Sequence, residues 1–83
     1  MTLADIVAHN LRVLRIAAGV PQQVLASRAG VSVSYISMLE RGQRIPPLAT
    51  LESVARALKV DPLSLIQEKA LGASRPRKRG RRG

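Results

Sequence analysis

Six positively charged side chains near the C-terminus are the first candidates for chemistry in this sequence. Residues 75–82 contain no acidic residue and six basic ones: Arg75, Arg77, Lys78, Arg79, Arg81 and Arg82. The preceding 74 residues hold eight basic and five acidic residues, a net charge of only +3. A run of guanidinium and ammonium groups binds polyanions, which indicates nucleic acid or an anionic membrane surface and favours nucleic acid. The alternative is a tail that only solubilises the chain.

Other kinds of site have little support in the sequence. There is no Cys, and the single His, His9, has no cluster of acidic residues around it. We therefore expect no metal site, no cofactor and no enzymatic activity. No apolar run approaches the roughly 18 residues that a membrane span needs, and no basic leader precedes one. We expect a cytoplasmic protein without a membrane partner.

The elements that would position a binding site are all helical. Apolar residues recur at helical spacing, and no stretch shows sustained alternation. The pattern predicts helices over about 3–18, 21–29 and 33–41, which end at Gly19, Gly30 and Gly42. An apolar stripe predicts a fourth helix over about 48–58. An Asp–Pro start predicts a fifth helix over about 62–70.

The C-terminal residues have a different composition. From Gly72 onward Gly, Pro, Ser and Arg dominate, and nothing apolar remains to pack. Such a segment cannot bury enough surface to fold. The sequence thus predicts an all-α protein, a compact five-helix bundle over residues 1–71, followed by a disordered basic tail over 72–83.

The segment 22–41 has the features of two short helices joined by a tight turn. Ala26 allows the helices to approach closely, and Gly30 suits a left-handed turn position. Val31 covers the turn, while an apolar wedge fills the space between the helices: Leu25, Ile36 and Leu39. The polar side chains of the later helix, Ser34 and Ser37, have no core to face. A helix held out from the body in this way fits the major groove of DNA.

This sequence resembles the Cro/phage-repressor, or XRE, family of helix-turn-helix proteins. The resemblance covers about residues 6–68 and rests on three segments in order: LRVLRIAAG, GVPQQVLASRAGVSVSYISMLERG and PPLATLESVARALKVDPLSLI. It implies the fold of a phage-repressor DNA-binding domain. It also implies a transcriptional regulator of bacterial or phage origin, associated with the nucleoid, that binds a palindromic operator as a dimer.

The resemblance assigns roles to individual positions. Gln22 matches a residue that contacts the DNA backbone, and Tyr35 and Arg41 match positions that commonly reach phosphates. Arg15 and Glu40 match a structural ion pair, although an ordinary solvated pair is the alternative. Base edges would be read by the exposed face of the recognition helix: Val33, Ser34, Ser37 and Met38. Val33 and Met38 have the alternative of burial in the core. Arg44 and the tail residues Arg75, Arg77, Lys78 and Arg79 complete the predicted DNA-binding set.

Two departures from the family pattern change what we expect. Pro21 and Pro47 stand where Ser or Thr usually caps a helix, and loss of such a cap costs about 1 kcal/mol. Near Pro21 the uncapped N–H groups are free to donate to a DNA phosphate. The recognition face also lacks Gln, Asn, Arg and Lys, which read purines through paired hydrogen bonds. Contacts with thymine methyls and with DNA shape are therefore expected to matter more.

The C-terminal part of the bundle has more apolar residues than one helix stripe needs. Leu63, Leu65, Ile66 and Leu71 either complete the core or form a homodimer contact through the fifth helix, as the resemblance implies. The principal hypothesis is a dimeric, autoregulatory repressor or controller. The alternative is an antitoxin or bridging coactivator whose main role is to bind another protein.

Overall fold

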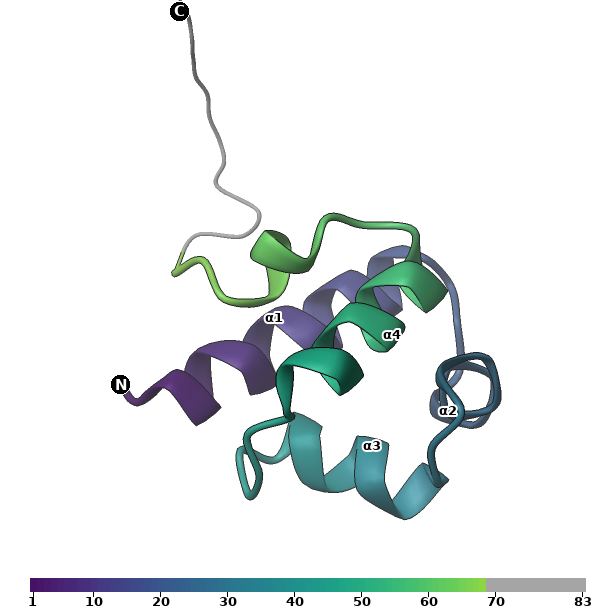
Figure 1. Ribbon diagram of the computed structural model, residues 1–83, viewed down its shortest axis with the longest axis horizontal. Coiled ribbons are helices and arrows are strands. Elements are labelled where there is room, and N and C mark those ends of the chain that lie inside the picture. Colours follow the sequence, from purple (N-terminus) through teal and green to yellow (C-terminus); the bar gives the residue numbers. More distant parts are fainter. Residues whose placement is uncertain (69–83) are drawn as a thin grey trace, which may run out of the picture.

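The computed structural model describes residues 1–68, which fold into four α-helices and one short 3₁₀ helix. The α-helices are α1 (Leu3–Ala17), α2 (Gln22–Ala29), α3 (Val33–Glu40) and α4 (Leu48–Leu58). The 3₁₀ helix η1 (Pro62–Leu65) follows α4 and packs against both α4 and α1. Figure 1 shows η1 above α1 and α4, α3 below them and α2 at the right-hand side of the molecule. Within this part of the chain there is no strand, as the sequence predicts.

Local sequence signals explain where the helices begin. The Thr2 hydroxyl accepts a hydrogen bond from the Asp5 backbone N–H, and the Asp5 carboxylate accepts one from the Thr2 backbone N–H. This reciprocal capping box starts α1. The hydrogen bond from the Thr2 backbone N–H, supported by the Thr2 side chain, lowers the pKa of Asp5 below its usual value. Ser32 caps α3 by accepting a hydrogen bond from Tyr35 N–H.

The core lies where the four α-helices and η1 meet. Its least exposed large side chains come from all five elements: Leu11, Leu25, Ile36, Leu39, Val54 and Leu65. The wedge predicted between α2 and α3 is confirmed, because Leu25 and Ile36 are completely buried and Leu39 is 1% exposed. Burying a side chain of this size stabilises a fold by about 1.5–3 kcal/mol. The wedge therefore fixes α3 firmly against the rest of the domain.

The fifth helix differs from the prediction. Asp61 caps it and Pro62 begins it as expected, but the helix is a single 3₁₀ turn that ends at Leu65. The Asn10 side chain donates hydrogen bonds to the carbonyls of Leu65 and Gln67, at 3.0 and 2.6 Å. In an α-helix those carbonyls would accept from amides further along the same helix. The predicted remainder of this helix beyond Glu68, the boundary at residue 71 and the tail lie outside the described residues.

Candidate nucleic-acid interface

The turn between α2 and α3 holds the two helices at a fixed angle. Gly30 adopts a left-handed conformation with φ of +74°, and its N–H caps the C-terminus of α2. The next amide, Val31 N–H, also donates back to the Ala26 carbonyl, at 3.0 Å. Ala26 is only 2% exposed, so a larger side chain there would separate the helices. The turn thus follows directly from a Gly at one position and an Ala four residues earlier.

One face of α3 borders a shallow hollow at the protein surface. Val33 and Ser34 are exposed at the start of the helix, and Ser37 and Met38 are half-buried one turn later. These four residues line the hollow together with Gln22 at the start of α2 and Arg41 just after α3: six of the twelve predicted DNA-contacting residues meet in one place. A convex helix beside the N-terminus of a second helix is an arrangement that can meet a groove and the phosphates along its edge.

Arg41 is oriented along α3 by its own neighbours. Its Nη1 donates to Ser37 Oγ at 2.5 Å, and its Nη2 donates to Gln43 Oε1 at 3.4 Å. The guanidinium is exposed, and Ser37 uses its oxygen as an acceptor in this contact. The hydroxyl hydrogen of Ser37 remains available for an acceptor outside the protein.

A hydrogen-bond network connects α1, α2 and α3 behind this face. Arg15 Nε and Nη2 donate to the Glu40 carboxylate at 2.5 and 3.1 Å, and Arg15 Nη1 donates to the Val20 carbonyl at 3.0 Å. The Arg15 and Glu40 side chains are 15% and 4% exposed, so this pair is largely removed from solvent. Gln22 Nε2 donates to Glu40 Oε1 at 3.0 Å, the same oxygen that accepts from Arg15 Nη2. The network therefore fixes Gln22 at the edge of the hollow.

The remaining predicted contact residues lie elsewhere. Tyr35 is half-buried and packs against the core, and Arg44 is exposed in the loop between α3 and α4. Neither of them lines the hollow. Four further predicted residues lie outside the described part of the chain: Arg75, Arg77, Lys78 and Arg79.

Neither α2 nor α4 has a side-chain cap at its N-terminus. Pro21 and Pro47 occupy the cap positions and make no side-chain hydrogen bond, as the sequence predicts. The first amides of α2 therefore remain without a capping acceptor beside Gln22, and α2 has no acidic residue in its first turn. This end of α2 carries the partial positive charge of the helix dipole and favours an anion.

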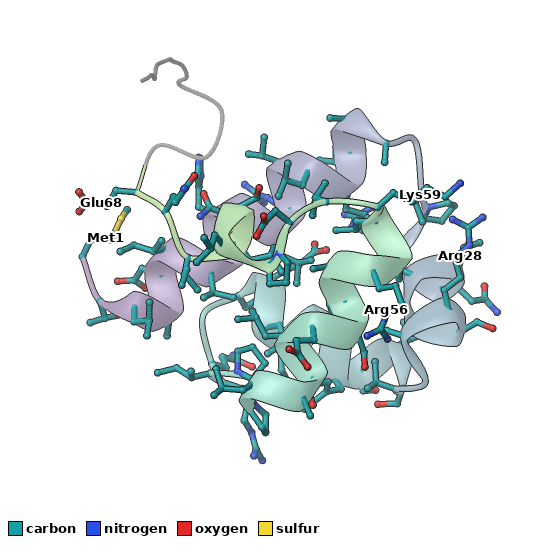
Figure 2. All side chains as sticks on the ribbon, turned by 45° about the horizontal axis from the view of Figure 1, so that its top comes forward. Met1, Arg28, Arg56, Lys59 and Glu68 are labelled. Atoms are coloured by element: carbon teal, nitrogen blue, oxygen red, sulfur yellow. The ribbon has the colours of Figure 1, made fainter. Side chains whose placement is uncertain are left out.

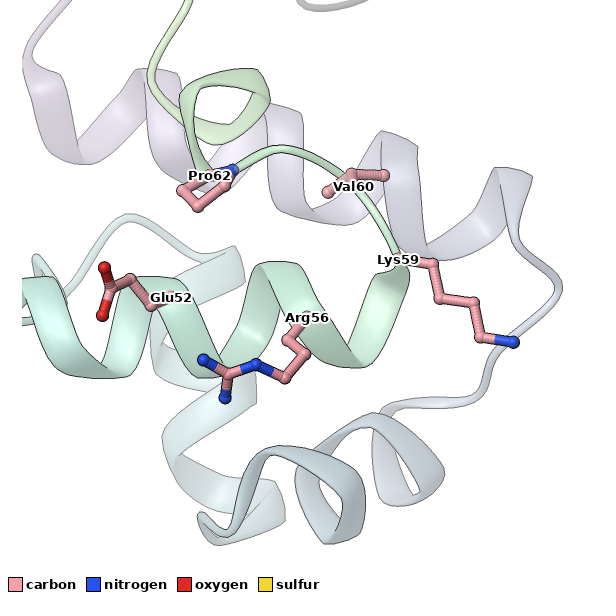
Figure 3. Close-up of a pocket in the computed structure, with 5 residues that line it drawn as sticks. All are labelled: Glu52, Arg56, Lys59, Val60 and Pro62. Atoms are coloured by element: carbon pink, nitrogen blue, oxygen red, sulfur yellow. The ribbon is translucent and has the colours of Figure 1, made fainter.

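A second group of cations lies away from α3. Figure 2 shows Arg28, Arg56 and Lys59 at the C-terminal ends of α2 and α4. Arg56 and Lys59 also line a hollow between α4 and the segment that leads to η1, opposite Val60 and Pro62 (Figure 3). Arg28 and Arg56 lie in the last turns of their helices, where a positive charge offsets the helix dipole. Helix stability thus accounts for these residues without a ligand.

Two polar contacts of the structure are not predicted by the sequence patterns. The Gln22–Glu40 hydrogen bond has no sequence signal, because it depends on the angle between α2 and α3. Asn10 is 1% exposed, and the apolar pattern of α1 does not predict that its side-chain amide is buried. The described part of the chain contains neither a helix that is long and apolar enough to cross a membrane nor a cluster of potential metal ligands.

These features define a helix-turn-helix domain of the Cro/phage-repressor type. Residues 11–65 match the helix-turn-helix family model HTH_3, which spans most of the described chain. The chain belongs to this family of DNA-binding transcriptional regulators.

Curated relatives include regulators of different lengths. The chain is 38% identical over 66 residues to the HTH-type transcriptional regulator y4dJ of Sinorhizobium fredii, covering 80% of this chain and 86% of that protein. It is 34% identical over 65 residues to the immunity repressor protein of Bacillus phage phi105, covering 78% of this chain. The match spans only 45% of the phage repressor, so that protein has a large part without a counterpart here.

Solved structures of regulators have the same fold. The restriction-modification controller protein C.AhdI of Aeromonas hydrophila superposes with a TM-score of 0.72 at 37% identity, covering 75% of this chain and 94% of that one. The clp gene regulator ClgR of Corynebacterium glutamicum superposes with a TM-score of 0.77 at 32% identity, covering 86% of this chain and 91% of that one.

Proposed function

We propose that this chain is a sequence-specific regulator of transcription that binds a palindromic operator as a homodimer. The observation that carries the proposal is the hollow on α3, where an exposed helix face adjoins an uncapped helix N-terminus. The described residues on this face include no acid. Glu40, the nearest carboxylate in sequence, is engaged by Arg15 and Gln22 and is largely buried. The face is therefore electrostatically suited to a phosphate-lined groove.

Each residue around the hollow has a distinct role in this proposal. Val33, which is 41% exposed, and Met38 meet thymine methyl groups, while Ser34 and Ser37 hydrogen-bond to base edges. Gln22 keeps one amide hydrogen on Glu40 and donates the other to a phosphate, beside the free amides of α2. Arg41, Arg44 and Tyr35 contact the flanking backbone, which sets the register of α3 without reading sequence.

The dimer contact is assigned to the segment around η1. Leu63 is 55% exposed and Ile66 is 38% exposed, although both are large apolar residues. A twofold axis beside this segment would bring two copies of α3 into successive major grooves, about 34 Å apart. Residues 72–83 would extend from the folded unit of residues 1–71 and contact phosphates through Arg75, Arg77, Lys78 and Arg79.

The relatives suggest the regulatory setting. C.AhdI is a restriction-modification controller protein, and the phi105 protein is an immunity repressor. We extend such a role to this chain as an autoregulatory repressor or controller that acts on the bacterial nucleoid.

Footprinting on DNA upstream of the gene for this protein tests the proposal. We expect protection of an inverted repeat, which Val33→Ser weakens because the contact with a thymine methyl is lost. Ile16→Ser is the matched control, since Ile16 is 63% exposed on α1 and does not line the hollow. Binding without sequence preference that disappears with moderate salt would contradict the proposal. It would favour an antitoxin or coactivator that acts through another protein.

A further inference from the structure

Asn10 is the one buried polar residue among residues 1–68, and it lies in the middle of α1. Its amide nitrogen donates to Leu65 O at 3.0 Å and to Gln67 O at 2.6 Å, across 55 and 57 residues of sequence. Both partners are carbonyl oxygens, so only a side chain with two donor hydrogens on one atom satisfies them together. Asn10 therefore ties the end of the domain to its first helix.

This contact determines the path of the chain after η1. The Leu65 side chain is 1% exposed, and the following residue, Ile66, leaves the helical conformation with φ of −115°. Figure 2 shows Glu68 and Met1 at the same end of the molecule, opposite the end that carries Arg28 and Lys59. The segment that follows η1 thus runs back towards the N-terminus of α1 instead of continuing as a helix. In this path Leu63 and Ile66 remain exposed.

We propose that Asn10 is a positioning residue for self-association, because it holds Leu63 and Ile66 in the arrangement that a second copy of the chain recognises. This inference rests on the proposed homodimer. A second copy is the favoured occupant because it presents the same two apolar side chains about a twofold axis. The C-terminal residues of the same chain are poorly suited to cover Leu63 and Ile66, since residues 69–83 contain seven Lys and Arg and a single large apolar residue, Leu71.

Asn10→Asp in the full-length chain tests the inference. The two side chains have the same shape, but a carboxylate has no donor for the two carbonyls and places negative charge against them. His9→Asp is the matched control, because it adds the same charge at the neighbouring, exposed position of α1. Sedimentation equilibrium should show a dimer dissociation constant raised by roughly tenfold or more in Asn10→Asp, and within about twofold of the wild type in His9→Asp.

Two further measurements separate positioning from loss of the fold. Amide exchange should become faster at Ile66 and Gln67 in Asn10→Asp, while the amides of α3 keep their protection. Binding of one protomer to a single operator half-site should remain unchanged. Leu63→Ser, which alters an exposed side chain, should weaken the dimer without faster exchange at Gln67.

The possible failures are distinguishable. If the wild type dimerises and Asn10→Asp dimerises equally well, the inference is wrong and the proposed function stands. If Leu63→Ser leaves the dimer constant unchanged, the surface assigned to the second copy is wrong. If the wild type stays monomeric with and without operator DNA, the proposed dimer itself fails. In that case fast amide exchange at Ile66 and Gln67 in the wild type would also exclude the hydrogen bonds from Asn10 as the contact that holds this segment.

Discussion

Removal of Arg15 should destabilise this domain far more than removal of a surface arginine. In Arg15→Ala, the Glu40 carboxylate, which is 4% exposed, keeps only the hydrogen bond from Gln22. Breaking a buried ion pair by deleting one partner costs about 3–5 kcal/mol, and an exposed pair contributes about 0–1 kcal/mol. Arg15 is 15% exposed, and its truncation lets some water reach the carboxylate. We therefore expect a loss of about 2–4 kcal/mol in the free energy of unfolding.

Urea denaturation followed by far-ultraviolet circular dichroism measures this loss. Folded domains have about 0.05–0.15 kcal/mol of stability per residue, which gives roughly 3–10 kcal/mol for residues 1–68, so the variant should lose a large share of its stability. Arg12→Ala is the matched control, because it removes the same charge from an exposed position of α1 and should change stability by less than about 0.5 kcal/mol. Equal midpoints for the two variants would show that the Arg15–Glu40 pair does not stabilise the domain. A double-mutant cycle with Glu40→Ala that gave less than about 0.5 kcal/mol of coupling would show the same.

Three other predictions concern DNA binding, the turn and acid stability. Deletion of residues 73–83 should lower the magnitude of the slope of log binding constant against log salt concentration by roughly 2–5, with little change in the ranking of operator sequences. Salt titration on operator and scrambled DNA measures both quantities. Identical slopes for the full-length and shortened chains would show that the tail does not touch DNA. Gly30→Ala should cost about 1–2 kcal/mol, because its φ of +74° is left-handed although the added Cβ meets nothing within 4 Å; urea denaturation that shows no loss would contradict this. Asp5→Asn should destabilise the domain at neutral pH. The pKa of Asp5 is lowered in the folded state, so the carboxylate stabilises the fold above its unfolded pKa, and this stabilisation is lost as the pH falls through the folded pKa. A difference in stability between the wild type and Asp5→Asn that persists below the folded pKa would be inconsistent with this.

Sequence patterns specify this fold well where the signal is local. Gly30, Ser32 and the Asp61–Pro62 pair mark a turn and two helix starts, because each acts on backbone groups within a few residues. The apolar stripes identify the core for a similar reason, since helical periodicity places those side chains on one face. The resemblance to phage repressors then directs attention to the exposed face of α3.

The features that sequence patterns could not predict depend on contacts across long stretches of the chain. The 3₁₀ turn ends at Leu65, where the carbonyls of Leu65 and Gln67 accept hydrogen bonds from Asn10, more than fifty residues earlier in the chain. The orientation of Gln22 likewise depends on Glu40, which α3 supplies. Helix propensity and periodicity contain no information about such pairs, because a buried amide and an exposed amide have the same local pattern.

In the proposed function, α3 reads a specific, twofold-symmetric DNA sequence. The most direct test is selection of binding sites from random duplex DNA by the purified full-length chain. We predict enrichment of an inverted repeat whose half-sites are centred about 10 base pairs apart, each with thymines in the segment covered by Val33 and Met38. The Val33→Ser variant should enrich a different half-site with the same spacing. Recovery of DNA without a common sequence, or of a sequence that Val33→Ser leaves unchanged, would show that α3 does not read the operator.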